Sequence, residues 1–280
     1  MTNNPNRIEF HQVRDFGEVL TVTFDFVREN FKPLMKGWLY IAGPFALTNA
    51  FISIYSMDML PSFSQFFSPL SLINLILGVL TYFLTYLVTL GYLHIYLHEK
   101  SPVEFNDLWQ FTKQNFWFFT GQYVVLIIVI LVGFILLILP GLYLIIVLSI
   151  APIIRIMERR AIFDSISRAR QLMSGFWLKT FGLTVVLFII LLVFGGLLQA
   201  PSIVLTFLWT FNNIEGGSFS GSPADNYPLL TVVAAIGQAL AVCVNIIPMV
   251  AYSLQYFNLR ERKEAVSLMD KVESLGTNKE

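Results

Sequence analysis

The chain has 280 residues, of which 56% are hydrophobic and 13% charged, and its formal net charge is zero at pH 7. Charged residues make up about a quarter of ordinary soluble domains, and a soluble core cannot absorb this much apolar surface. The composition therefore excludes a soluble globular protein and predicts an integral membrane protein. The single cysteine, Cys243, excludes an intrachain disulfide framework.

The N-terminal 36 residues are too rich in charged side chains to form a short cleavable signal peptide. Apolar residues recur within them at three- or four-residue spacing, with acidic and basic residues on the other faces. This pattern predicts an amphipathic surface helix over about residues 10–32. Its apolar stripe consists of Val13, Phe16, Leu20, Phe24, Val27 and Phe31.

Five apolar stretches follow, and a helix needs roughly 20 such residues to cross the hydrocarbon core of a membrane. The third, residues 118–154, would be about 56 Å long as one helix, almost twice the core thickness. We therefore expect a reversal at Leu139-Pro140-Gly141, where proline interrupts the helical hydrogen bonds and glycine tolerates a tight turn. The predicted spans are about 37–55, 70–97, 118–139, 141–154, 177–200 and 228–257, in one membrane domain (1–257) with a charged cytoplasmic tail (258–280).

The basic residues test this topology independently. Of the 18, five fall before the first span, two between the second and third, six from Arg155 to Lys179 around the start of the fifth, and five after the sixth. The other connections carry no lysine or arginine. By the positive-inside rule, this distribution predicts a multi-pass protein of the cytoplasmic (inner) membrane with both termini in the cytoplasm.

An amphipathic stretch precedes each pair of spans. The second stripe is Phe105, Leu108, Thr112 and Phe116, and the third is Ile162, Ile166, Ala169, Met173 and Phe176. We interpret the chain as three repeats of a surface helix and a two-helix hairpin, which predicts an all-α bundle of six spans with three interfacial helices. The alternative is that these helices pack against the cytoplasmic ends of the bundle.

Part of the chain also resembles a known group of proteins. The matching residues are the run Pro140-Gly141-Leu142-Tyr143-Leu144, then Ala151-Pro152 and Glu158, and the run Leu172-Met173-Ser174-Gly175-Phe176-Trp177 with Phe181. They resemble bacterial six-span membrane proteins, among them the membrane domain attached to some glycerophosphoryl diester phosphodiesterases and related families of unknown function. The resemblance covers roughly a quarter of the chain, and Ala169 stands where the pattern has a serine.

In that group the hydrolase chemistry resides in a separate soluble domain after the membrane part. Only 23 residues follow Phe257, which cannot hold a catalytic barrel. The resemblance thus implies architecture and location, not phosphodiesterase activity.

Catalytic patterns are weak. His94 and His98 lie four apart and would share a helical face, as metal ligands often do, but a catalytic zinc site needs a third ligand and the remaining histidine is His11. No nucleophile has an evident base partner, and no phosphate-binding or dinucleotide motif is present. We therefore expect no catalytic, metal or cofactor-binding residues, no cofactor, and no enzymatic activity. A lipid-modifying enzyme is the last alternative.

Transport is the second alternative, for a neutral or lipid-like substrate, because the span cores lack ionisable residues. They contain amides instead, of which Gln238 and Asn245 share one face of the sixth span and are predicted to pack helices together. Gly237 with Ala241 and Ala235 with Ala239 form small-residue pairs beside them. This span is therefore the candidate contact to a neighbouring span, a second copy or another membrane protein.

The interpretation that the sequence favours is a non-enzymatic membrane protein that organises or senses lipid or scaffolds partners. Six basic residues lie in one cytoplasmic loop, where each contributes about 1 kcal/mol to the attraction of an acidic lipid surface. We expect membrane lipids as partners and no nucleic acid. The candidate anionic-lipid contacts are Arg155, Arg159, Arg160, Arg168, Arg170 and Lys179.

Overall fold

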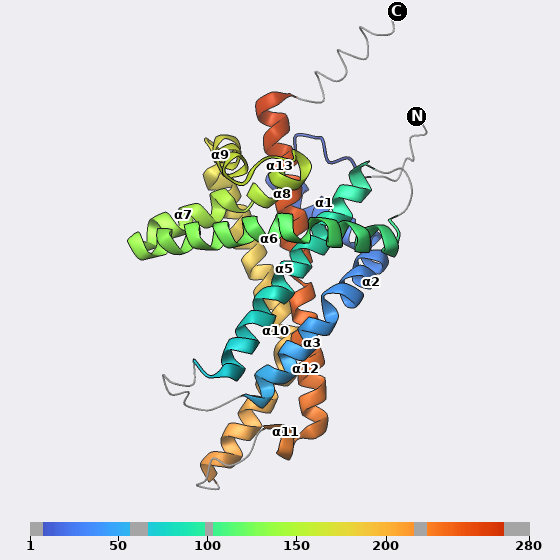
Figure 1. Cartoon of the computed structure of the whole chain (residues 1–280), viewed down its shortest axis with the longest axis vertical. Helices are drawn as coiled ribbons and strands as arrows, with labels where there is room; N and C mark the ends of the chain where they lie inside the picture. Colours follow the sequence, from blue (N-terminus) through green and yellow to red (C-terminus); the bar gives the residue numbers. More distant parts are fainter. Residues whose placement is uncertain (1–7, 57–66, 99–102, 216–222, 266–280) are drawn as a thin grey trace, which may run out of the picture. The chain divides into compact units, whose positions relative to one another are not determined.

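The computed structural model describes residues 8–56, 67–98, 103–215 and 223–265 (Figure 1). These residues are almost entirely helical and contain no strand, which confirms the predicted all-α class. They form two compact units: unit 1 comprises Met1–Phe31, Leu90–Leu187 and Ile247–Glu280, and unit 2 comprises Lys32–Thr89 and Phe188–Ile246. Each unit draws on separate parts of the sequence, so neither is a single stretch of chain.

Five helical segments are long and apolar enough to cross a membrane. They are α5 (Pro69–His98), α6 (Phe105–Leu136), the segment Ile138–Met157, most of α10 (Trp177–Glu215), and the segment Pro228–Glu264. The pair α2 (Phe31–Ile41) and α3 (Gly43–Tyr55) supplies a sixth if it counts as one span, although it is bent by 60°. The predicted number of six lies within this range.

Prolines mark where the apolar segments break. Proline has no N–H to donate and its ring clashes with the carbonyl four residues earlier, so a helix accepts it readily only in the first turn. Helices α3, α7 (Ile138–Leu148), α8 (Ala151–Met157) and α13 (Ile246–Glu264) each carry a proline as their second or third residue. These prolines are Pro44, Pro140, Pro152 and Pro248.

The reversal in the third apolar stretch lies at Leu137, three residues before the predicted turn. Leu137 is extended, with φ −166° and ψ 154°, and Pro140 and Gly141 already belong to the first turns of α7. The prediction of a hairpin is correct in kind and wrong in position, because the proline clash acts one turn toward the N-terminus. Helices α6 and α7 then pack closely: a Cβ on Gly133 would meet Leu144 at 2.6 Å and the Cα of Gly141 at 3.2 Å.

Only two of the three predicted surface helices are separate elements. They are α1 (Phe16–Glu29) and α9 (Ile162–Met173), which ends before Gly175 at a φ of +82°. The second predicted surface helix is instead the first part of α6, which runs without a break from Phe105. No proline or glycine interrupts Gln114-Asn115-Phe116, so the helix continues from the amphipathic part into the apolar part.

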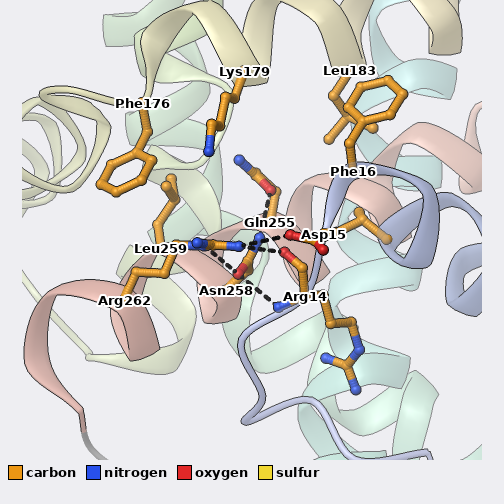
Figure 2. A pocket seen from close by; sticks show the side chains of 11 residues that line it. Arg14, Asp15, Phe16, Phe176, Lys179, Leu183, Gln255, Asn258, Leu259 and Arg262 are labelled. Carbon is orange, nitrogen blue, oxygen red and sulfur yellow. Dashed lines mark hydrogen bonds and ion pairs between the residues drawn. The ribbon is translucent and has the colours of Figure 1, made fainter.

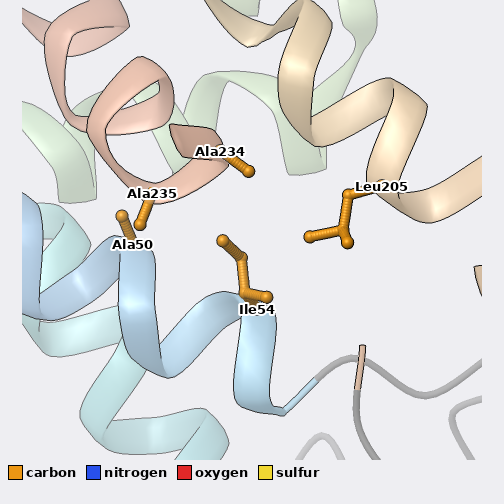
Figure 3. Packing of buried hydrophobic residues seen from close by; sticks show 5 residues of the cluster. All are labelled: Ala50, Ile54, Leu205, Ala234 and Ala235. Atoms are coloured by element: carbon orange, nitrogen blue, oxygen red, sulfur yellow. The ribbon is translucent and has the colours of Figure 1, made fainter. Parts of the chain in front are cut away.

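The core of unit 2 contains small residues where three helices meet. Figure 3 shows Ala50 and Ile54 of α3, Leu205 of α10, and Ala234 and Ala235 of α12 (Pro228–Cys243) turned toward one another. Short α11 (Pro223–Asn226) precedes α12. Alanines at such a contact let helix backbones approach closely, as small residues do in membrane proteins.

Polar contacts also join helices of unit 2, α10 to α12 and α2 to α5. The Ser202 hydroxyl lies 3.2 Å from the Ala234 carbonyl oxygen, and the Trp38 indole donates to Thr85 Oγ1 at 2.9 Å. A Cβ on Gly237 would lie 2.3 Å from the carbonyl oxygen of Leu198. The small-residue pattern of the sixth span therefore serves contact with α10 and α3 inside the chain.

Candidate functional site

Helix α1 has three distinct faces. Val19, Thr23 and Phe26 are buried and face the protein, whereas Glu18, Asp25 and Glu29 are exposed on another side of the helix. The predicted apolar stripe lies between these faces. Phe16 is 45% exposed and Phe24 is 39% exposed, although both are large and apolar. A helix with one face on protein, one charged and one apolar but uncovered is suited to the headgroup layer of a membrane.

The other two predicted stripes face the protein instead. Leu108 and Thr112 are buried at the start of α6, and Ala169 and Met173 are buried on α9. The alternative interpretation, packing against neighbouring helices, therefore describes these two segments.

A pocket of about 310 Å³ lies within unit 1, where the start of α1 meets the first turns of α10 and the last turns of α13. Figure 2 shows the side chains that line it. The apolar ones come from all three helices and the polar ones mainly from α13. The lining residues are Arg14, Asp15, Phe16, Val19, Phe176, Lys179, Leu183, Gln255, Asn258, Leu259 and Arg262.

Hydrogen bonds hold the polar floor of this pocket in place. Asn258 Oδ1 accepts from the Arg14 backbone N–H and from Arg262 Nε, each at 3.0 Å. Arg262 also donates to the Arg14 carbonyl at 2.8 Å. Behind it, Gln255 accepts from Asn258 at 3.3 Å and donates to Thr180 Oγ1 at 3.0 Å. The chain that enters α1 is therefore fastened to α13, and α13 to α10.

The Arg14 guanidinium points away from the pocket, and Figure 2 shows it directed outward from the floor. It is buried and donates to the backbone carbonyls of Phe10, at 3.1 Å, and Glu9. Burial lowers the pKa of Arg14, and the charges of Glu18 and Glu9 oppose that effect. Arg14 therefore contributes its backbone to the pocket and its side chain to the fold.

Two cationic groups remain for the pocket itself. Lys179 points inward toward Gln255 (Figure 2), and no acidic side chain pairs with it among the residues that the structure describes. Arg262 lies 3.6 Å from Asp15 Oδ1, but the Asp15 side chain is 92% exposed. The pocket thus combines positive charge and amide groups with apolar walls.

The six basic residues proposed from the sequence have different environments. Arg155 is buried; it donates to the Phe118 carbonyl at 3.0 Å and its guanidinium lies 3.7 Å from the centre of the Phe118 ring. Arg168 pairs with Glu158 and Glu264, and Arg160 pairs with Glu158. The exposed members of the set are Arg159, Arg160, Arg170 and Lys179, and of these Arg160 is the one paired with Glu158.

Arg262 escaped prediction because the charged tail was expected to begin at residue 258. Helix α13 continues to Glu264 instead, and Asn258 and Glu261 on its last turns are buried. The spacing of Gln255, Asn258 and Arg262, three and four residues apart, places them on one helical face and was the available signal.

Glu158 lies at the centre of a second polar cluster, at the end of α8. It accepts a hydrogen bond from Tyr256 at 2.9 Å and pairs with Arg160 and Arg168. Burial acts to raise the pKa of Glu158, but the hydrogen bonds from Tyr256 and Arg160 and the charges of Arg168 and Arg160 outweigh it and lower the pKa. Arg168 is also buried in part, which lowers its pKa, yet Glu264 and Glu158 raise it overall. The cluster joins α8, α9 and α13.

The two histidines lie together as their spacing predicts. Their ring centroids are 4.2 Å apart, and His98 Nδ1 lies 2.8 Å from the His94 carbonyl oxygen. Within the described ranges, no group of three histidine, cysteine or acidic side chains could hold a metal ion. The absence of a metal or cofactor remains a prediction.

Gln238 and Asn245, the two amides predicted to pack helices together, differ in their partners: one contacts another helix and the other its own chain segment. Gln238 Nε2 lies 3.5 Å from Ser53 Oγ, which joins α12 to α3. Asn245 donates to the Val242 carbonyl at 3.0 Å and thus caps the break between α12 and α13. Its contact is local.

Comparison with known proteins gives no match to a family model, to a curated protein or to a solved structure. The resemblance to the membrane domains of glycerophosphoryl diester phosphodiesterases therefore stays a prediction from the residues that carry it.

Proposed function

We propose that the chain is a non-enzymatic protein of the cytoplasmic membrane that organises or senses lipid at the cytoplasmic headgroup layer. Both termini lie in the cytoplasm in this proposal. The observation that carries it is the uncovered apolar face of α1, which lies beside a face packed on the protein and a face of acidic residues. Such a helix is anchored to the protein on one side and leaves a second side for lipid.

The energetics favour lipid on that face. Full burial of a large apolar side chain is worth about 1.5 to 3 kcal/mol, and on α1 both Phe16 and Phe24 are more than a third exposed, as are Val13 and Phe31 just beyond its two ends. Placing α1 between headgroups and acyl chains removes this surface from water. The acidic face can then remain in water, so no charge has to be buried.

The distribution of basic residues supports the same placement. Of the 18 lysines and arginines, all but Lys32 and Lys36 belong to unit 1, which also contains α1. Positive charge on the cytoplasmic side is the usual determinant of membrane orientation and also attracts acidic lipids.

An environment-sensitive fluorophore tests this function directly. A single cysteine replaces either Phe24 or the adjacent Asp25 in a Cys243→Ala background. Each variant is labelled with the fluorophore and reconstituted into vesicles that contain brominated lipid. We expect strong quenching at Phe24 and little at Asp25, because neighbouring residues of one helix then lie in lipid and in water. Equal quenching at both positions would contradict the proposal.

Transport of a neutral substrate is the second candidate, and one feature of unit 2 favours it. The side-chain oxygens of Asn49 on α3 and Gln238 on α12 are buried and accept no hydrogen bond from the residues that the structure describes. A buried polar atom without a partner is costly, so it often marks a place for water or a ligand. Passage of a small amide or polyol through proteoliposomes, lost in Gln238→Leu, would establish this alternative.

A further inference from the structure

The pocket between α1, α10 and α13 lies at the level where two apolar segments become charged. The first turns of α10 contain Trp177 and Lys179, and the last turns of α13 contain Arg260, Arg262 and Lys263. Tryptophan and basic residues collect where membrane helices pass through the headgroups. A pocket at that level would lie among the lipid headgroups.

The charges of the pocket suit an anion. Lys179 and Arg262 both present their cationic groups to it (Figure 2), and the one acidic lining residue, Asp15, is almost fully exposed at its edge. The floor is fixed by the hydrogen bond that Asn258 accepts from the Arg14 backbone N–H and the one that Gln255 donates to Thr180, so an anion would enter an ordered site. Ordered donors reduce the entropy lost on binding.

The walls of the pocket suit an acyl chain. Phe16 and Leu183 form one side, and Phe16 lies against α10 where Gly182 leaves room: a Cβ there would be 3.8 Å from the Phe16 ring. Phe16 is also the first helical residue of the exposed apolar stripe of α1. An apolar path therefore leads from the pocket along α1 toward Leu20 and Phe24.

We infer that this pocket binds an acidic phospholipid, with the phosphate-bearing headgroup at Lys179 and Arg262 and an acyl chain along Phe16. The inference rests on the proposed function, since it requires α1 to lie in the headgroup layer. A volume of about 310 Å³ is at the small end of ligand pockets and fits a headgroup better than a whole lipid. Free phosphate would use the cations but leave the apolar path unoccupied.

The test uses the full chain, delipidated in mild detergent and titrated with phosphatidylglycerol while bound lipid is counted by native mass spectrometry. Lys179→Gln should weaken retention about fivefold, the factor that corresponds to about 1 kcal/mol per basic side chain. The matched control is Arg170→Gln, which removes an equally exposed charge outside the pocket and should behave as wild type. Phosphatidylcholine, which has no net charge, should bind both variants alike.

Two further measurements distinguish binding of the lipid headgroup from binding of the acyl chain. Phe16→Ser should weaken retention of phosphatidylglycerol, and millimolar inorganic phosphate should fail to displace the lipid from wild type. Displacement by phosphate alone would overturn the inference in favour of a soluble anion. Equal retention by wild type and Lys179→Gln would overturn it as well, as would an equal loss in Arg170→Gln.

Failure of this inference and failure of the proposed function give different results. If only the pocket is assigned wrongly, the label at Phe24 is still quenched by lipid while Lys179→Gln has no effect. If the proposed function is wrong, the label at Phe24 is not quenched, whatever lipid the detergent-solubilised protein retains.

Discussion

Glu158 joins three helices, because two of its partners come from α9 and α13. Tyr256 donates to it from α13, and Arg168 pairs with it from α9. Its side chain is 11% exposed, so these contacts form with little competition from water. A buried carboxylate that keeps its partners stabilises the fold, whereas one that loses them is costly.

A pH dependence follows from the lowered pKa of Glu158. A group whose pKa is lower in the folded state stabilises the protein above its unfolded pKa, about 4.3, and this stability is lost as pH falls through the folded pKa. We expect the melting temperature in detergent to fall steeply below about pH 4.3. The Glu158→Gln variant should have a free energy of unfolding about 2 to 3 kcal/mol lower at pH 7, because the hydrogen bonds to a charged carboxylate are gone. Its melting temperature should also depend less on pH in the acidic range.

The control for that measurement is Glu29→Gln, which removes an exposed carboxylate from the outer face of α1 and should leave the pH profile unchanged. A Glu158→Gln profile parallel to that of wild type would mean that other carboxylates govern acid stability.

Residue chemistry also explains why the sequence alone could not separate the basic residues that are engaged within the protein from those that remain exposed. The cluster of six basic residues is plain in the sequence, but Arg155 and Arg168 are engaged by the carbonyl of Phe118 and the carboxylate of Glu264, which lie 37 and 96 residues away. Spacing along one helix carries no information about such remote partners. Lys179 was predicted, whereas Arg262 required knowledge that α13 continues past residue 257.

At the scale of helices, Gly237 marks a close approach of α12 to α10. A Cβ there would lie 2.3 Å from the Leu198 carbonyl oxygen, and backbone cannot move aside as a flexible side chain can. We expect Gly237→Ala to destabilise the protein by about 1 to 3 kcal/mol, since inserting a methyl group into a packed contact forces the helices apart. Thermal unfolding in detergent measures the loss.

Gly196 provides the matched control for Gly237. It also lies within a helix, α10, but a Cβ there would meet nothing within 4 Å. Gly196→Ala should therefore be neutral or should stabilise the helix by up to about 1 kcal/mol, because alanine has the better helix propensity. Equal destabilisation by both changes would show that backbone flexibility, and not the α10 contact, determines the effect.

The elements themselves were predictable where composition or proline determines them. Apolar length identified the spans, and Pro140 indicated a break that lies within one turn of it. The faces of the amphipathic helices were less predictable, because an apolar stripe looks the same whether lipid or protein covers it. On α1 the residues that face the protein are Val19, Thr23 and Phe26, which lie next to the predicted stripe and not within it.

At the scale of the whole molecule, the basic residues restrict how the chain crosses the membrane. Lysines and arginines stand on both sides of the hairpin formed by α6 and α7, so the hairpin must return to the side from which it starts. Each arm, Phe105–Leu136 and Ile138–Met157, is long enough for a full crossing. The tip is nonetheless apolar, and Leu139 is 78% exposed there.

Cysteine reporters decide this topology. Reporters at Ser64 and Ser220 should react with a membrane-impermeant reagent added to intact cells, whereas those at Asp107 and Ser267 should react only after lysis. Ser64, Ser220 and Ser267 lie outside the described residues. Labelling of Asp107 in intact cells would contradict the predicted orientation. Leu139 should be labelled from outside if both arms cross fully. If Leu139 is reached from neither side, the hairpin ends within the membrane as a re-entrant loop, because an apolar tip has no polar group that must reach water.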